Sequence, residues 1–206
     1  MRPNRRLALR ALTLVAVWGL PGLSLAGRQI EEPLSDSVRT ALSTAVAGAA
    51  PPEPVLPSDQ HRRDYDRWRQ HASQRLARYK SHAVEREEFL QTLWYEARRA
   101  GLSLSLVLGL VQVESAFRKY AVSSAGARGY MQVMPFWSRL IGDGDESRLF
   151  QMQANLRFGC VILRHYLDSE RGDLFMGLGR YNGSRGQTAY PQAVLAAQRQ
   201  WQHEVD

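Results

Sequence analysis

Residues 104–135, LSLVLGLVQVESAFRKYAVSSAGARGYMQVMP, join an apolar run to a loop that is rich in small residues. The part from 104 to about 117 is apolar on almost every side, and Ser103 before it is a residue type that caps helices. Such a helix belongs in a protein core, so the stretch predicts a helical domain built around it. It contains one acidic residue, Glu114, and the next along the chain is Asp143.

Glu114 has apolar neighbours on its face of the predicted helix. Val107, Leu110 and Val111 precede it at helical spacing, so they share that face. Leaving water disfavours an ionised carboxylate and raises its pKa from about 4.3 toward neutrality, as a general acid requires. The alternative is a glutamate at a helix end that simply reaches solvent.

The residues after Glu114 favour a binding site. Residues 123–129, SSAGARG, are too rich in small side chains for a helix, and their glycines let the backbone approach a ligand closely. Gln132 follows between two methionines, and its amide can both donate and accept hydrogen bonds. Acid, permissive loop and amide together suggest a cleft that binds sugars.

The rest of the chain also reads as helices. Apolar residues recur at three- and four-residue steps, and no stretch alternates with period two for long enough to make a strand. The class is therefore all-α. Further helices are expected over residues 36–46, from about 59, and over 83–100, 153–167, 173–181 and 191–202.

The first 26 residues resemble a secretory signal peptide. Four arginines lie in the first ten residues, an uncharged apolar stretch follows, and small residues precede position 27. A retained transmembrane anchor is the alternative, but the uncharged stretch is shorter than about 20 residues and Pro21 interrupts it. Arg28 stands where a lipoprotein would need cysteine. We expect a soluble exported protein without a stable membrane anchor.

Prolines after the first short helix divide the rest of the chain. Residues 47–57, AGAAPPEPVLP, read as a semi-rigid linker. The expected organisation is a signal peptide over 1–26, a short helix and Pro/Ala-rich linker over 27–58, an N-terminal helix over 59–82 and a main domain over 83–206.

Charge and metal-binding residue types exclude several functions. Removing the four leader arginines from 27 basic residues leaves 23 against 20 acidic ones, a net charge of +3 rather than +7. These charges are scattered, so we expect no nucleic-acid partner. His61, His71 and His82 are about three helical turns apart, too far for one metal ion. The single cysteine, Cys160, reads as a small buried residue, and neither a metal nor a cofactor is expected.

Three ordered blocks resemble the catalytic core of soluble lytic transglycosylases, a branch of the lysozyme-like superfamily. The first runs without a gap through Glu114-Ser, the Gly-Ala-Arg-Gly loop and Met131-Gln-Val-Met-Pro135. The second is Asn155-Leu-Arg-Phe-Gly159, and the third is Arg180-Tyr-Asn-Gly183. The resemblance covers roughly residues 83–200. It implies a lysozyme-like helical fold with a groove for the glycan strands of peptidoglycan, and hence a place in the periplasm.

The resemblance also assigns roles by position. It implies that Glu114 is the acid/base and that Ser123 and Gln132 contact the sugar near the scissile bond. The remaining substrate-binding assignments are Met134 in the groove wall, Tyr181 orienting Glu114 or the acetamido group, and Asn182 fixing a turn. Tyr130 stands where the family usually has leucine, which could narrow a subsite or add a stacking surface. Gly183-Ser184 replaces the usual Ala-Gly. Of the tryptophans, Trp137 is the one we consider for the groove.

The expected reaction cleaves the bond between N-acetylmuramic acid and N-acetylglucosamine without water and leaves 1,6-anhydro ends. One enzyme acid suffices if the substrate supplies both nucleophiles. Two alternatives remain open. A distant acid such as Asp143, Asp145 or Glu146 would make the protein a hydrolase similar to goose-type lysozymes, and an idle groove would make it a glycan-binding envelope protein.

Overall fold

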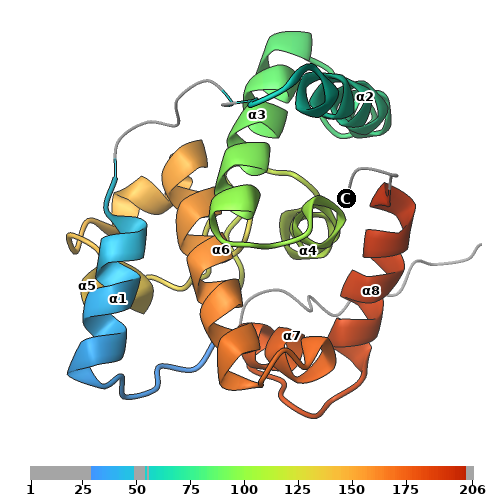
Figure 1. Ribbon diagram of the computed structural model, residues 1–206. Coiled ribbons are helices and arrows are strands. Elements are labelled where there is room, and N and C mark those ends of the chain that lie inside the picture. Colours follow the sequence, from blue (N-terminus) through green and yellow to red (C-terminus); the bar gives the residue numbers. More distant parts are fainter. Residues whose placement is uncertain (1–28, 49–53, 55, 203–206) are drawn as a thin grey trace, which may run out of the picture.

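The computed structural model describes residues 29–48, 54 and 56–202, and the predicted signal peptide over 1–26 lies outside these residues. The described part is helical, with two isolated β-bridges beside Arg128 and no strand, which confirms the all-α class (Figure 1). The elements are α1 (Asp36–Val46), α2 (Asp59–Leu76), α3 (Ala83–Arg99), α4 (Leu104–Ser115), α5 (Phe136–Ile141), the 3-10 helix η1 (Glu146–Phe150), α6 (Met152–Ser169), α7 (Leu174–Asn182) and α8 (Ala189–Trp201).

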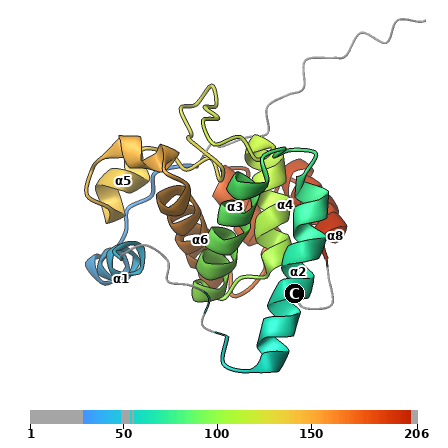
Figure 2. The same cartoon turned by 90° about the horizontal axis from the view of Figure 1, so that it is seen from above.

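Helix α4 is the centre of the fold. Ten of its twelve residues are buried, and the predicted cap is confirmed because the Ser103 hydroxyl accepts a hydrogen bond from the Leu106 N–H. Figure 2 shows α4 between α3 and α8. A Cβ atom on Gly109 would lie 2.6 Å from the Gln198 nitrogen, so glycine here lets the backbone of α8 come close.

Helix α4 ends two residues before the expected position. Ala116 and Phe117 have φ angles of 49° and 61°, in the left-handed region, so the chain turns away directly after Ser115. The turn directs the following segment into the loop that carries the small residues. Glu114 therefore lies in the last turn of a buried helix and beside that loop.

Helices α1 and α2 share the core with the rest of the described chain. Leu42 and Val46 of α1 are buried, and α1 contacts α5 and α6. Trp68 and Leu76 of α2 are buried, and α2 contacts α3. The segments before residue 83 thus pack against the domain that follows, although the domain boundaries themselves stay a prediction.

The periodicity did not reveal α5 or η1, which have six and five residues. Trp137 in α5 is 2% exposed and packs against Phe136 and Tyr166 at ring separations of 5.3 and 6.1 Å. The expectation that Trp137 lines a groove is therefore wrong. The burial of Cys160 confirms its role as a small core residue.

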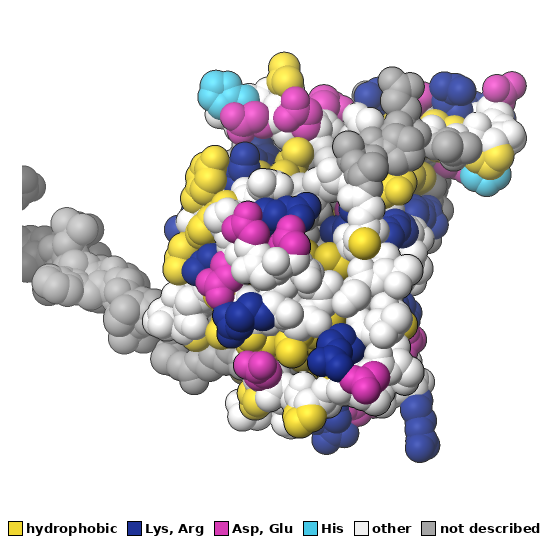
Figure 3. All heavy atoms as spheres, turned by 90° about the vertical axis from the view of Figure 1, so that its left-hand side faces the viewer, with side chains coloured by type: hydrophobic (Ala, Val, Ile, Leu, Met, Phe, Trp, Pro, Cys, Tyr) yellow, Lys and Arg dark blue, Asp and Glu magenta, His cyan; other side chains and the backbone are white. Residues whose placement is uncertain are grey.

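The surface is mixed in charge. On the face in Figure 3, Lys and Arg side chains lie among Asp and Glu, with no large area of one sign. None of the helices in the described ranges combines the length and hydrophobicity needed to cross a lipid bilayer.

Candidate active site

Glu114 is a buried carboxyl group to which a tyrosine of the last helix donates a hydrogen bond. Its side chain is 4% exposed, and the Tyr190 hydroxyl donates to Oε1 at 2.5 Å. The carboxyl group thus lies out of water at the C-terminal end of α4, where an uncharged hydroxyl donates a hydrogen bond to it.

Tyr190 is the site residue that sequence reasoning missed. It lies in the first turn of α8 and is 1% exposed. Burial, the charge of Glu114 and the hydrogen bond to Glu114 hold the pKa of Tyr190 well above its usual value, so it remains a protonated donor. The only local signal was its place before Pro191 at the start of the predicted last helix, which does not distinguish it from other tyrosines.

Tyr181, which was expected to orient Glu114 or a substrate group, is fully buried with its hydroxyl bound elsewhere. The hydroxyl donates to the Met131 carbonyl oxygen at 2.7 Å. Burial and then the charge of Glu114 raise the pKa of Tyr181, which places its ring near the acid. The phenol that bonds Glu114 is thus Tyr190, and Tyr181 holds the loop beside it.

The motif around Asn155 and Gly159 fixes the same loop from α6. The Asn155 side-chain oxygen accepts from the Met131 N–H at 2.8 Å, and its amide donates to the carbonyls of Arg128 and Leu149 at 2.8 Å each. A Cβ atom on Gly159 would lie 2.6 Å from the Met131 Cβ. All three blocks of the sequence pattern therefore meet at Met131, next to the end of α4.

The side chains of Gln132 and Ser123 form hydrogen bonds with backbone groups of the same loop. Gln132 is 1% exposed, with φ +47°, and its amide nitrogen donates to Ala121 and Gly129 carbonyls at 3.1 and 3.0 Å. Because both amide hydrogens are used, a ligand can meet only the amide oxygen. The Ser123 hydroxyl accepts from the Ala127 N–H at 3.1 Å. Their contacts to sugar remain predictions.

Met134 and Asn182 border the same region. Met134 is half-buried, and its N–H donates to the Gln29 side-chain oxygen at 3.3 Å. Asn182 is buried at the end of α7, where Gly183 adopts φ +78° and caps the helix. The predicted turn after Tyr181 is thus present, and Gly183 supplies the left-handed conformation that it needs.

Tyr130, the departure from the family pattern, is 2% exposed and packs on Phe89 with ring centroids 4.9 Å apart. Burial raises the pKa of its phenol. Tyr130 also lines a depression of about 790 Å³ that aromatic, basic and acidic side chains surround. These include Tyr79, Lys80, Phe117, Lys119 and Tyr120, together with the acidic Glu85 and Glu88.

The acids considered as alternative bases are engaged elsewhere. Asp143 pairs with Arg148, which holds the Asp143 pKa below its usual range. The Asp145 carboxylate accepts from the Ser147 hydroxyl and N–H, and these bonds lower its pKa. Glu146 pairs with Arg128 and Arg139.

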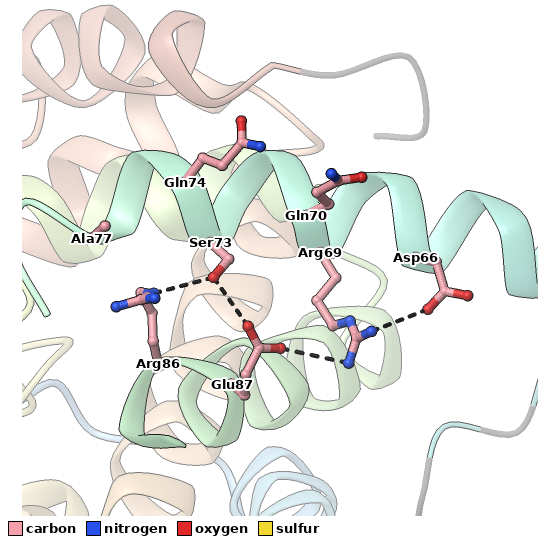
Figure 4. A pocket seen from close by; sticks show the side chains of 8 residues that line it. All are labelled: Asp66, Arg69, Gln70, Ser73, Gln74, Ala77, Arg86 and Glu87. Atoms are coloured by element: carbon pink, nitrogen blue, oxygen red, sulfur yellow. Dashed lines mark hydrogen bonds and ion pairs between the residues drawn. The ribbon is translucent and has the colours of Figure 1, made fainter. Parts of the chain in front are cut away.

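Another depression, with polar residues, lies between α2 and α3 (Figure 4), and none of the predicted site residues lines it. There Ser73 donates to Glu87 at 3.0 Å and accepts from Arg86 at 3.1 Å, so it joins the two helices. In the described ranges, no three His, Cys, Asp or Glu side chains are grouped so that they could hold a metal ion.

Comparisons with known proteins agree with the three blocks. Residues 92–202, slightly more than half of the chain, match the family described as Transglycosylase SLT domain. The chain is 38% identical over 88 residues to a protein named membrane-bound lytic murein transglycosylase C from Actinobacillus pleuropneumoniae serotype 5b (strain L20), covering 39% of this chain and 24% of that protein. The protein of the same name from Histophilus somni (strain 2336) is 34% identical over 119 residues, 50% of this chain and 33% of its own length.

The chain thus spans about a third or less of the length of these curated relatives. The matched region contains Glu114, Met131, Tyr181 and Tyr190, and so includes the groups that form the site. The resemblance seen in the sequence is confirmed, and the chain belongs to the transglycosylase SLT domain family.

Proposed function

We propose that the protein is a peptidoglycan lytic transglycosylase in which Glu114 is the single acid/base. The observation that carries the proposal is a carboxyl group that is 4% exposed, lies at a helix end and bonds a neutral phenol. A group in this setting can hold a proton and also release it, which a residue that is first acid and then base must do.

The first step needs one proton from Glu114. The acid protonates the glycosidic oxygen between N-acetylmuramic acid and N-acetylglucosamine, and the C1–O bond breaks. The carbonyl oxygen of the acetamido group on the same N-acetylmuramic acid bonds to C1. The leaving chain departs with its hydroxyl restored, and Glu114 is left as a carboxylate that the Tyr190 hydroxyl stabilises.

The second step returns the proton to Glu114. The carboxylate takes the proton of the C6 hydroxyl, and the C6 oxygen bonds to C1 as the acetamido oxygen leaves. The product is a 1,6-anhydro-N-acetylmuramic acid end, and no water is consumed. Glu114 is neutral again, so one enzyme carboxyl serves both steps.

The interactions of the other candidate acids support a mechanism with one carboxyl group. Asp143 and Glu146 bond arginines, and Asp145 caps η1. A hydrolase of the two-acid type needs a carboxylate free to activate water. Glu114 has the buried setting that the three candidates lack.

The loop beside Glu114 supplies the proposed sugar contacts. We assign the Gln132 amide oxygen and the Ser123 hydroxyl to the sugar at the scissile bond, and Met134 to the groove wall. Tyr181 and Asn182 hold the loop and the turn.

The site of action follows from the same substrate. Peptidoglycan lies outside the cytoplasmic membrane, and the first 26 residues have the pattern of a signal peptide. We therefore place the enzyme in the periplasm.

Product mass tests the proposal. Purified peptidoglycan is digested with the protein, and the soluble fragments are analysed by mass spectrometry. Anhydro ends, lighter by one water than reducing ends, are expected. Reducing ends alone would make the protein a hydrolase, and glycan binding without soluble fragments would make it a binding protein.

A further inference from the structure

The segment before α1 lies against the candidate active site. Residues 29–35 run from the start of α1 toward the end of α6 and α7 (Figure 1). Leu34 packs against the core at one end of the segment. Glu32 then pairs with Arg180 of α7 at 2.8 Å, and Arg180 also binds Glu170. The segment is thus attached to the element that carries Tyr181.

Gln29 is the deepest residue of this segment. It is 4% exposed, although its neighbour Ile30 is 60% exposed. Its side-chain oxygen accepts a hydrogen bond from the Met134 N–H at 3.3 Å. Its amide nitrogen is buried and reaches no described partner with the geometry of a hydrogen bond.

The Gln29 carboxamide also lies close to Tyr181. Burial and the charge of Glu114 raise the pKa of Tyr181, and the Gln29 amide acts in the opposite direction. Gln29 therefore lies between Met134, whose N–H it bonds, and Tyr181. It reaches this place from 105 residues away in the sequence.

A carboxamide has the same carbonyl and N–H groups as the acetamido group on each sugar of peptidoglycan. A backbone N–H that donates to the carbonyl oxygen of one of these groups can also donate to that of the other. Gln29 and an acetamido group cannot use the Met134 N–H and the space beside Tyr181 together. Occupation by Gln29 thus excludes the sugar from this position.

We propose that residues 29–32 form a self-inhibitory strap, in which Gln29 imitates an acetamido group and which peptidoglycan must displace. The identity of the displacing glycan rests on the proposed function. Within the described residues, the strap is attached by a hydrogen bond at Gln29 and a half-exposed ion pair at Glu32. Each of these interactions contributes little net stability, so a polymer with many sugars can outcompete them.

Glycan binding tests the strap separately from catalysis. The protein is purified as cells accumulate it, with Glu114→Gln to prevent turnover, and intact mass establishes whether residues 29–32 are retained. Chitotetraose, which bears four acetamido groups on N-acetylglucosamine, is titrated by calorimetry. Gln29→Ala is expected to lower Kd about two- to tenfold, the effect of losing one competing hydrogen bond.

Two neighbouring carboxylates supply the matched control. Glu32→Gln breaks the ion pair with Arg180 and is expected to lower Kd about twofold. Glu31→Gln makes the same chemical change at an exposed residue with no ion pair in the described chain, so it should leave Kd unchanged. An equal effect of both variants would indicate net charge rather than the strap.

If Gln29 instead contributed to sugar binding, Gln29→Ala would raise the Kd for chitotetraose. If Gln29→Ala weakens binding or does not change it, the strap is not a competitor. Loss of residues 29–32 during maturation, or no binding by any variant, also overturns the proposal.

Amide spectra supply a second measurement. The Met134 resonance should move on Gln29→Ala, and the Gln29 side-chain resonances should move when chitotetraose binds the chain that retains Gln29. Static Gln29 resonances at saturation would contradict displacement. Failure of the proposed function would instead appear in the product masses, because neither measurement here involves bond cleavage.

Discussion

Glu96 and Glu114 are buried glutamates on adjacent helices, with exposed fractions of 2% and 4%, but different groups face them. Arg157 of α6 donates two hydrogen bonds to Glu96, with Nε at 3.0 Å and Nη2 at 2.7 Å from Oε1. The same arginine donates to the Gly48 carbonyl at 2.9 Å. Glu114 instead receives the neutral phenol of Tyr190.

The difference separates a structural carboxylate from a reactive one. An arginine remains charged at every relevant pH, so Arg157 forms a lasting ion pair with Glu96 that ties α3 to α6. The phenol of Tyr190 donates to Glu114 without itself adding a positive charge, which suits a group that must give and take back a proton in the proposed mechanism. Burial is therefore a poor guide to function until the partner is known.

The same substitution made at both positions should have the most different effects. Glu114→Gln should reduce release of soluble muropeptides by at least about 10²–10⁴-fold, because the amide has no proton to give, while the fold persists. Glu96→Gln should destabilise the fold through the buried Arg157 charge and leave kcat of the folded protein nearly unchanged. Mass spectrometry of muropeptides and circular dichroism measure both. Substantial turnover by Glu114→Gln would remove Glu114 from its proposed role.

Removing the arginine tests the other half of the comparison. Arg157→Met should lower the free energy of unfolding by about 3 kcal/mol, because the buried Glu96 then keeps only its longer ion pair with Arg99, at 3.7 Å. Urea denaturation measures the change. The control is the double variant Glu96→Met/Arg157→Met, which should recover most of the loss because no charge is then buried alone. A single variant as stable as wild type would mean that the ion pair is not structural.

Tyr190→Phe tests the hydrogen bond that Glu114 receives. Losing a hydrogen bond to a charged group corresponds to about 1.5–3 kcal/mol, so kcat should fall about tenfold or more. The alkaline limb of the pH–rate profile should move to higher pH, because loss of a donor disfavours the carboxylate. Tyr181→Phe is the control, since it removes a hydroxyl that binds Met131 instead. A larger loss of kcat in Tyr181→Phe would reverse the assignment of the two tyrosines.

A third carboxylate, Glu170, gives the smallest expected effect. Hydrogen bonds from Arg185 and Arg180 lower its pKa from 4.5 to about 2. Its stabilisation is therefore complete above pH 4.5 and is lost as the pH falls toward 2. Glu170→Gln should lower the free energy of unfolding by about 1 kcal/mol at pH 7, since solvent screens pairs near the surface.

The pH dependence provides the check on Glu170. Urea denaturation at several pH values should show the difference between wild type and Glu170→Gln shrinking below pH 4.5. Glu88→Gln on the exposed side of α3 should show little difference at any pH. A difference in unfolding free energy that does not change with pH would assign the effect to packing.

Local patterns predicted most of the fold. The helix over residues 36–46 has the bounds expected, and α3, α6, α7 and α8 differ from expectation by at most two residues at either end. These agreements arise because helical periodicity and capping depend on residues three or four apart. Short elements such as α5 lack that repetition, and Trp137 was misassigned because its burial depends on Phe136 and, from a distant helix, Tyr166.

By itself the sequence determined that α4 would be a buried helix, that Glu114 would lie near its end and that a glycine-containing loop would follow. Those features depend on neighbouring residues and their chemistry. Only the tertiary structure decided which groups meet at the acid, since Tyr190 bonds Glu114 across 76 residues and Gln29 reaches Met134 across 105. Hydrogen bonds between distant residues depend on how helices pack, and no local periodicity records that packing.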